Sequence, residues 1–248
     1  QVKDLESPYY IYPRLADQHI DLSQNWELSS EEFPVENLAK LKENAWFTVA
    51  YPTSVQMANY KAGILGDPYK HLNAREHEKL EQKVWYYKKH FTIPKKHNGY
   101  SCILNFDGID YFAKVWLNGI ELGKHRGIFG GPVIDVSENL NYGGDNELIV
   151  EVISANYGKP SFNPNSPGNI VKGWFLMGGS AMEPFFNLGL WRNVRIEFVP
   201  EYHMERPFLF TEKIENNQAT IGFNIELFAG KNTLDYQLHP WNNCQISN

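Results

Sequence analysis

The sequence is poor in cysteine and contains no long apolar run and no cluster of basic residues. Its two cysteines, Cys102 and Cys244, do not make a disulfide framework, and Cys102 lies in an apolar run that is typical of a buried small side chain. No apolar stretch approaches the roughly 18 residues that a membrane-spanning helix needs. The net charge is −6, without a run of five basic residues, so we expect neither a membrane nor a nucleic-acid partner.

The patterns of common catalytic and cofactor sites are also missing. No Gly-rich turn joins a strand to a helix as a phosphate-binding loop requires, and Ser180 lacks the final glycine of a nucleophile elbow. The eight histidines are scattered, and His71 and His77 do not share a helical face as a pair of zinc ligands would. We therefore expect no cofactor, no metal and no catalytic residue in this chain.

The sequence does contain an aromatic content of 15% and long stretches in which apolar and polar residues alternate. From about residue 84 to 199 this period of two predicts strands. Asn118-Gly119 and Gly143-Gly144 supply turns, so short antiparallel strands of a sandwich or jelly roll are expected. The residues predicted to share one face of their strands are Trp85, Tyr87, Phe91 and Ile93 (interrupted by Lys89), Tyr111, Ala113, Val115 and Leu117, then Leu148, Val150 and Val152, and finally Val194, Ile196 and Phe198.

Residues 1 to about 80 are mixed, with extended pieces, prolines and two short helical patterns. In the first pattern Leu38, Leu41 and Ala45 fall on one helical face. In the second, Asn73 and Glu76 have the spacing of a capping box, followed by mostly charged residues. We predict that the second helix lies on the surface.

The segment from about 155 to 190 breaks the strand pattern and is rich in Gly, Pro and Asn. A loop this long within a compact domain is usually either functional or disordered. The segment is too rich in aromatic residues for disorder, so it is the predicted binding surface. Those aromatic residues are Trp174, Phe175, Phe185 and Phe186.

After Pro200 a new β unit is expected. Residues 218–227 alternate cleanly, and 233–239 is a candidate neighbouring strand. Roughly 45 residues are too few for an independent sandwich of about seven strands. We therefore expect the chain to stop partway into a second β domain. The chain starts at Gln1 without an initiator Met, as expected of a processed secreted protein or of a piece of a longer one.

Several stretches together resemble the N-terminal domain of glycoside hydrolase family 2, with matching order and spacing over more than a hundred residues. The stretches are WYYKKHFTIP (85–94), LNFDGIDYFAKVWLNGIELGKHRGIF (104–129), IDVSENLNYGGDNELIVEV (134–152) and GLWRNVRIEF (189–198). The resemblance implies an all-β, galactose-binding-like jelly roll with short peripheral helices over 1–200. It further implies an incomplete immunoglobulin-like sandwich over 201–248, while the catalytic (β/α)8 barrel with the family's two catalytic glutamates is absent.

A narrower likeness links residues 45–73 to the β-mannosidase and exo-β-glucosaminidase branch, through Pro-Thr-Ser-Val at 52–55 and Gly-Ile-Leu-Gly-Asp-Pro-Tyr at 63–69. β-Mannosidases of this branch carry a Trp-Asp-Trp-Gly stretch whose Asp and Trp approach the sugar. This sequence has Trp174-Phe175-Leu176 there, so the acidic residue is replaced. Trp174 and Phe175 are candidate sugar-facing or domain-interface residues, and the alternative is packing under a long loop.

Two aspartates flank Gly108 where the chain enters a predicted strand. In several family members the residue equivalent to Asp110 reaches towards the active site, so Asp110 is a candidate substrate-binding residue; the alternative is a role in the turn. We predict that Asp107 caps the turn by accepting backbone N–H bonds. Trp116 and Trp191 are expected in the core or on a sheet face, and Arg192 is expected to pair with a carboxylate.

The resemblance implies that the parent protein is a retaining exo-β-glycosidase and that this chain is its non-catalytic N-terminal part, inactive alone. Its expected partners are a terminal β-linked sugar and its own catalytic barrel. Two alternatives stay open: a free-standing carbohydrate-binding module, and a protein-interaction sandwich whose loop aromatics bury against another chain. The family's role in polysaccharide breakdown implies a bacterial periplasmic or secreted location.

Overall fold

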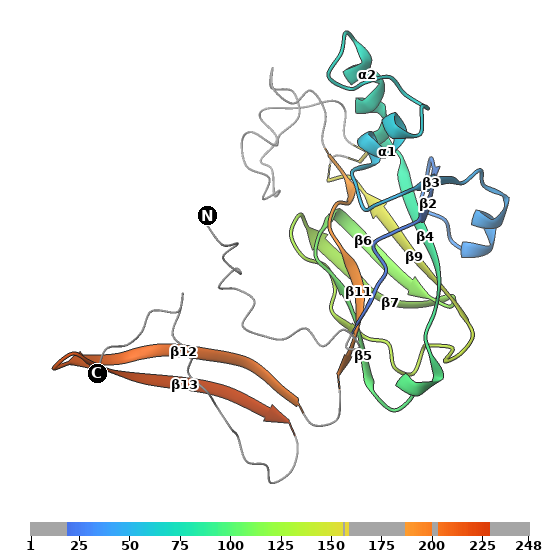
Figure 1. Ribbon diagram of the computed structural model, residues 1–248. Helices are drawn as coiled ribbons and strands as arrows, with labels where there is room; N and C mark the ends of the chain where they lie inside the picture. The colour runs from blue at the N-terminus through green and yellow to red at the C-terminus, as the bar shows by residue number, and fades with distance from the viewer. Residues whose placement is uncertain (1–18, 156, 159–186, 200–202, 229–248) are drawn as a thin grey trace, which may run out of the picture. The chain divides into compact units, whose positions relative to one another are not determined.

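The computed structural model describes residues 19–155, 157–158, 187–199 and 203–228. The chain divides into two compact units, His19–Phe198 and a second that joins Gln1–Gln18 to Val199–Asn248. Figure 1 shows the strands and helices of the larger unit and the hairpin of the second.

Within the described residues, the larger unit is built from two β-sheets. The large sheet has seven strands in the order β10-β6-β9-β4-β2-β3, with β7 also paired to β6, and the small sheet has four in the order β1-β11-β5-β8. Neighbouring strands such as β4 and β9, or β6 and β9, run antiparallel, so the predicted all-β antiparallel sandwich is confirmed. The strands are β1 (His19–Asp21), β2 (Trp26–Glu31), β3 (Phe47–Val49), β4 (Val84–Thr92), β5 (Ser101–Phe106), β6 (Ile109–Leu117), β7 (Ile120–Gly127), β8 (Ile134–Asp135), β9 (Asp145–Ile153), β10 (Gly189–Leu190) and β11 (Val194–Val199).

The main core lies between the two sheets, and the predicted apolar faces of β4, β6, β9 and β11 supply much of it. All of the residues predicted to share those faces are buried, and nearly all join one cluster with Trp26, Leu28 and Leu104. Each large apolar side chain removed from water contributes about 1.5–3 kcal/mol to stability. Lys89, the interruption in the β4 pattern, turns its ammonium to the carbonyl of Gln24 at 2.5 Å, and burial lowers its pKa.

The turn predicted at Asn118-Gly119 is confirmed. Both residues have positive φ, 51° and 82°, as a two-residue hairpin turn of the mirror-image type requires. The Asn118 amide donates to the Asn139 carbonyl at 2.7 Å and its oxygen accepts from the Glu147 N–H at 2.9 Å. The sequence therefore determines the β6–β7 hairpin locally and ties it to β9.

The helices differ from the predicted ones. Ala45 lies outside the first, which is a 3-10 helix, and Asn73 does not cap the second, because the N-cap is Leu72 and no side-chain capping bond is made there. Instead the Asn73 amide donates to the Asp67 carbonyl at 3.0 Å. The helices are η1 (Leu38–Glu43), α1 (Val55–Lys61), α2 (Asn73–Glu78), η2 (Lys79–Gln82) and η3 (Lys95–His97). Among the described residues, no helix has the length and hydropathy to cross a membrane.

The outer face of the large sheet carries a second apolar cluster under the segment that contains η1. The Tyr86 hydroxyl donates to the Glu151 carboxylate at 2.7 Å and accepts from the Val35 N–H at 2.9 Å. Lys114 lies 3.6 Å from the same carboxylate, and burial raises the pKa of Tyr86. One fully buried phenol thus links the segment to the sheet.

Replacing Tyr86 by phenylalanine is expected to lower the free energy of unfolding by about 2–3 kcal/mol, because Glu151, only 2% exposed, loses a hydrogen bond without regaining water. Urea denaturation followed by tryptophan fluorescence measures this loss. Tyr51→Phe, at a position 61% exposed, is the control and should change stability by less than about 0.5 kcal/mol. Equal effects of the two substitutions would contradict the role given to Tyr86.

The described part of the second unit is one hairpin, β12 (His203–Glu215) with β13 (Gln218–Phe228). β13 confirms the strand expected over 218–227, and its described partner is the preceding strand, while residues 233–239 lie outside the described residues. Leu209 is paired with Phe223, and both are more than half exposed. A two-stranded hairpin with such apolar residues is at best marginal alone in water.

Candidate functional site

Asp110 lies at the second position of β6, where the strand enters the large sheet. It is paired with Gly189 of β10, and its side chain is only 8% exposed. The peptide bond from Asp110 to Tyr111 is cis. Aspartate is seldom this buried, so Asp110 is the first residue to consider for a specific role.

The turn before Asp110 is held by main-chain bonds. The N–H of Asp107 donates to the Asn193 carbonyl at 2.9 Å, and the Ile109 N–H donates to the Gly130 carbonyl at 2.9 Å. The Asp107 carboxylate, predicted to accept backbone N–H groups, instead accepts from Arg195 of β11. Arg195 also donates to Glu197 at 2.6 Å, so this aspartate takes part in an ion-pair network across the small sheet.

Gly189 sits where three elements meet. Its φ is +131°, and a Cβ there would clash with the Tyr87 hydroxyl and lie 3.0 Å from the Thr53 carbonyl. That hydroxyl donates to the same carbonyl at 3.1 Å. The N–H of Val55, the first residue of α1, donates to the Leu188 carbonyl at 2.7 Å. The start of α1 is therefore hydrogen-bonded to the residue before β10, and β10 pairs with β6 at Asp110.

An aromatic group lies beside the same turn. The Trp191 indole donates to the Ile128 carbonyl at 2.7 Å, and its ring meets that of Phe129 edge-on, with centroids 6.0 Å apart. A Cβ on Gly108 would lie 2.8 Å from the indole, so the ring rests against bare backbone. Phe129 is 65% exposed and presents an aromatic face to solvent.

The expected pairing of Arg192 with a carboxylate is not found among the residues that the structure describes. The Arg192 guanidinium lies 4.3 Å from the centroid of the Trp191 ring, a cation–π contact. Arg195 forms the ion pairs with Asp107 and Glu197. Trp191 is half-buried at the sheet edge. The exposed guanidinium thus extends the aromatic surface with hydrogen-bond donors.

The structure places one of the three predicted site residues. Asp110 is brought beside Gly189, the start of α1 and the 127–131 loop, whereas Trp174 and Phe175 lie outside the described residues. Sequence reasoning did not single out Phe129. Its signal was the run Gly-Ile-Phe-Gly-Gly at 127–131, which leaves a large aromatic side chain between glycines where no strand buries it.

The groups gathered at this site are of kinds that can recognise a polar ring. A carboxylate accepts hydrogen bonds from hydroxyl groups, and indole and phenyl faces accept the C–H face of a ring. Among the described residues, no three His, Cys, Asp or Glu side chains form a group that could hold a metal ion.

The fold is an all-β sandwich of the galactose-binding-like class. The chain belongs to the family described as the glycosyl hydrolase 2 galactose-binding domain-like family, whose model matches residues 26–172. The resemblance found in the sequence is thereby confirmed.

Curated relatives include β-mannosidase B of Neosartorya fischeri, 29% identical over 194 residues, which are 73% of this chain and 22% of that protein. Another is the β-galactosidase of Thermoanaerobacter pseudethanolicus, 26% identical over 148 residues, 60% of this chain and 18% of that protein. The chain thus spans about a fifth of the length of the relatives it matches.

Solved structures share the fold. The β-D-mannosidase of Dictyoglomus thermophilum aligns with a TM-score of 0.65 and 24% identity, over 85% of this chain and 26% of that one. A β-glucuronidase of Ruminococcus gnavus aligns with a TM-score of 0.62 and 17% identity, over 89% of this chain and 36% of that one. At these sequence identities, the similarity shows a shared fold only.

Proposed function

We propose that this chain is the N-terminal, non-catalytic part of a retaining exo-β-glycosidase of the β-mannosidase or β-galactosidase type. The observation that carries the proposal is the similarity to β-mannosidases over 73% of the chain, in a region that contains the Asp110 turn. We assign 1–200 to the sugar-binding jelly roll and 201–248 to the beginning of an immunoglobulin-like sandwich. A periplasmic or secreted location suits an enzyme that degrades polysaccharides.

In this proposal Asp110 accepts hydrogen bonds from hydroxyls of the terminal sugar, with Trp174 and Phe175 contributing aromatic faces. The reaction itself belongs to two carboxyl groups of a barrel outside this chain, about 5–5.5 Å apart, one acting as the acid and one as the nucleophile. The sandwich acts by positioning, since small displacements of a bound substrate cost large factors in rate.

The test is hydrolysis of nitrophenyl β-mannoside, β-galactoside, β-glucuronide and β-glucosaminide by the 248-residue chain and by the protein translated from the whole gene, called the whole-gene protein below. We expect the whole-gene protein to cleave at least one substrate and the 248-residue chain to cleave none. Cleavage by the short chain would show that it holds its own catalytic groups. If neither form cleaves any of the four substrates, the glycosidase proposal is wrong.

A further inference from the structure

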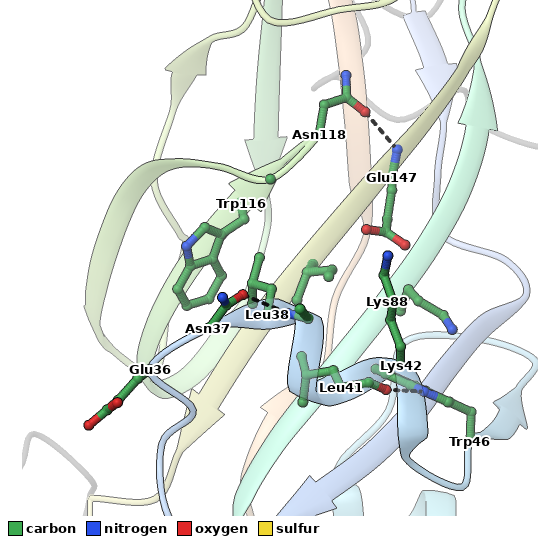
Figure 2. Close-up of a pocket in the computed structure, with 13 residues that line it drawn as sticks. Glu36, Asn37, Leu38, Leu41, Lys42, Trp46, Lys88, Trp116, Asn118 and Glu147 are labelled. Carbon is green, nitrogen blue, oxygen red and sulfur yellow. Dashed lines mark hydrogen bonds between the residues drawn. The ribbon is translucent and has the colours of Figure 1, made fainter.

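A pocket of about 530 Å³ lies on the outer face of the large sheet, between η1 and strands β4, β6 and β9. This volume falls within the range of small-molecule sites, about 300–1,000 Å³. Figure 2 shows Trp116 of β6 on one side of η1 and Trp46 on the other. The floor is apolar: Leu41 and Ile149 are 2% and 4% exposed.

The walls of this pocket are fixed in place by hydrogen bonds. The Asn37 side chain accepts from the Ala39 N–H at 2.8 Å and caps η1, and the Trp46 indole donates to the Leu41 carbonyl at 3.1 Å. The Tyr86 hydroxyl holds the start of this segment through Val35. A pocket built this way does not need to be ordered when a ligand enters, which favours affinity.

The two indole rings are not equivalent. The Lys88 ammonium lies 4.0 Å from the centroid of the Trp46 ring and 2.9 Å from the Glu27 carboxylate, so it occupies one face of Trp46. Trp116 is half-buried, and the Lys114 ammonium lies 6.0 Å from the centroid of its ring. Trp116 packs against the outer apolar cluster and also lines the pocket, so it is the indole with the more distant cation on which a ligand ring could stack.

The charges of the rim select the kind of ligand. Two acidic side chains, Glu36 and Glu147, and two basic ones, Lys42 and Lys88, line the pocket, so a charged ligand gains no net attraction. The Glu147 side chain is 41% exposed; its Oε2 lies 3.4 Å from Nε2 of the exposed His90, and the carboxylate retains lone pairs that can accept further hydrogen bonds. A ligand that suits this lining is neutral, has an apolar face and carries hydroxyl groups.

We propose that this pocket binds a neutral saccharide, with the C–H face of one ring stacked on Trp116 and its hydroxyls hydrogen-bonded to Glu147 and Lys42. Trp116 follows Asp110 by six residues on β6, roughly 20 Å along an extended strand at about 3.3 Å per residue. The pocket is thus a second sugar site, which stands independently of the role proposed for Asp110.

The experiment is calorimetric titration of the 248-residue chain with mannopentaose, cellopentaose and xylopentaose. At least one is expected to bind with a Kd of about 1 mM or tighter. Trp116→Ala should weaken that binding about tenfold or more, equivalent to ~1.4 kcal/mol, and Glu147→Gln about threefold. Phe33→Ala removes an aromatic side chain that is 75% exposed and outside the pocket, and it should leave the affinity unchanged.

Three outcomes would overturn the proposal. The first is that none of the three probes binds at about 10 mM, ten times the weakest expected Kd. The second is that both Glu147→Gln and folded Trp116→Ala bind the saccharide as tightly as the unchanged chain. Loss of binding in Asp110→Asn instead would place the sugar at the Asp110 site. The third is that Trp116→Ala abolishes a dimer seen by sedimentation, which would make the pocket a contact between copies of the chain.

Discussion

Replacing Asp110 by asparagine is expected to lower kcat/KM of the whole-gene protein by about 10- to 100-fold on its best nitrophenyl glycoside. The substitution keeps the shape of the side chain and removes its charge, so each hydrogen bond from a sugar hydroxyl to the carboxylate, worth roughly 1.5–3 kcal/mol, becomes a neutral one worth roughly 0.5–1.5 kcal/mol. The buried position of Asp110 beside β10 strengthens this effect, because water screens the contact poorly there. Initial rates across a range of substrate concentrations supply the measurement.

Asp145→Asn is the matched control. Asp145 begins β9 and lies against the exposed His90 at 2.9 Å, so its replacement should leave kcat/KM within about twofold, as expected of an exposed pair worth under 1 kcal/mol. Thermal melting of both variants separates lost stability from lost recognition. An Asp110→Asn protein with unchanged kcat/KM would reduce Asp110 to a residue of the turn.

Gly189→Ala is expected to lower the free energy of unfolding of the larger unit by about 3–5 kcal/mol. The methyl group would meet the buried Tyr87 hydroxyl and the Thr53 carbonyl, and the backbone has a φ of +131°. Overpacking costs about 1–3 kcal/mol and a strained φ about as much again. Urea denaturation followed by tryptophan fluorescence gives the change in unfolding free energy.

Gly63→Ala isolates the backbone contribution. Gly63 also has positive φ, +71°, but an added Cβ would meet nothing within 4 Å, so only about 1 kcal/mol should be lost. If Gly189→Ala were no worse than Gly63→Ala, the close packing of β10 against Tyr87 and the start of α1 would not be a feature of the protein in solution.

The sandwich could be predicted because its signals are local. The alternation in β4, β6, β9 and β11 places every second residue in the core, and Asn118-Gly119 encodes a tight hairpin by its backbone preference. The helices were predicted less well. Asn73 and Glu76 have the spacing of a capping box, but the Asn73 side-chain amide donates to the Asp67 carbonyl six residues earlier. A local sequence pattern does not reveal that contact.

The surroundings of Asp110 could not be read from the sequence, because they are assembled from distant segments. Gly189 reaches Asp110 only through the pairing of β10 with β6, and Trp191 reaches Ile128 across 63 positions. The same holds for Asp107, whose partner Arg195 lies 88 positions away. Short motifs indicate the turn, and the fold alone decides which side chains surround it.

The most direct measurement is a crystal structure of the whole-gene protein with its terminal monosaccharide bound. The account predicts an Asp110 carboxylate oxygen within about 3.2 Å of a sugar hydroxyl, the range of a hydrogen bond. A sugar seated in the catalytic barrel with no contact to Asp110, and with that carboxylate bonded only within its own turn, would contradict it.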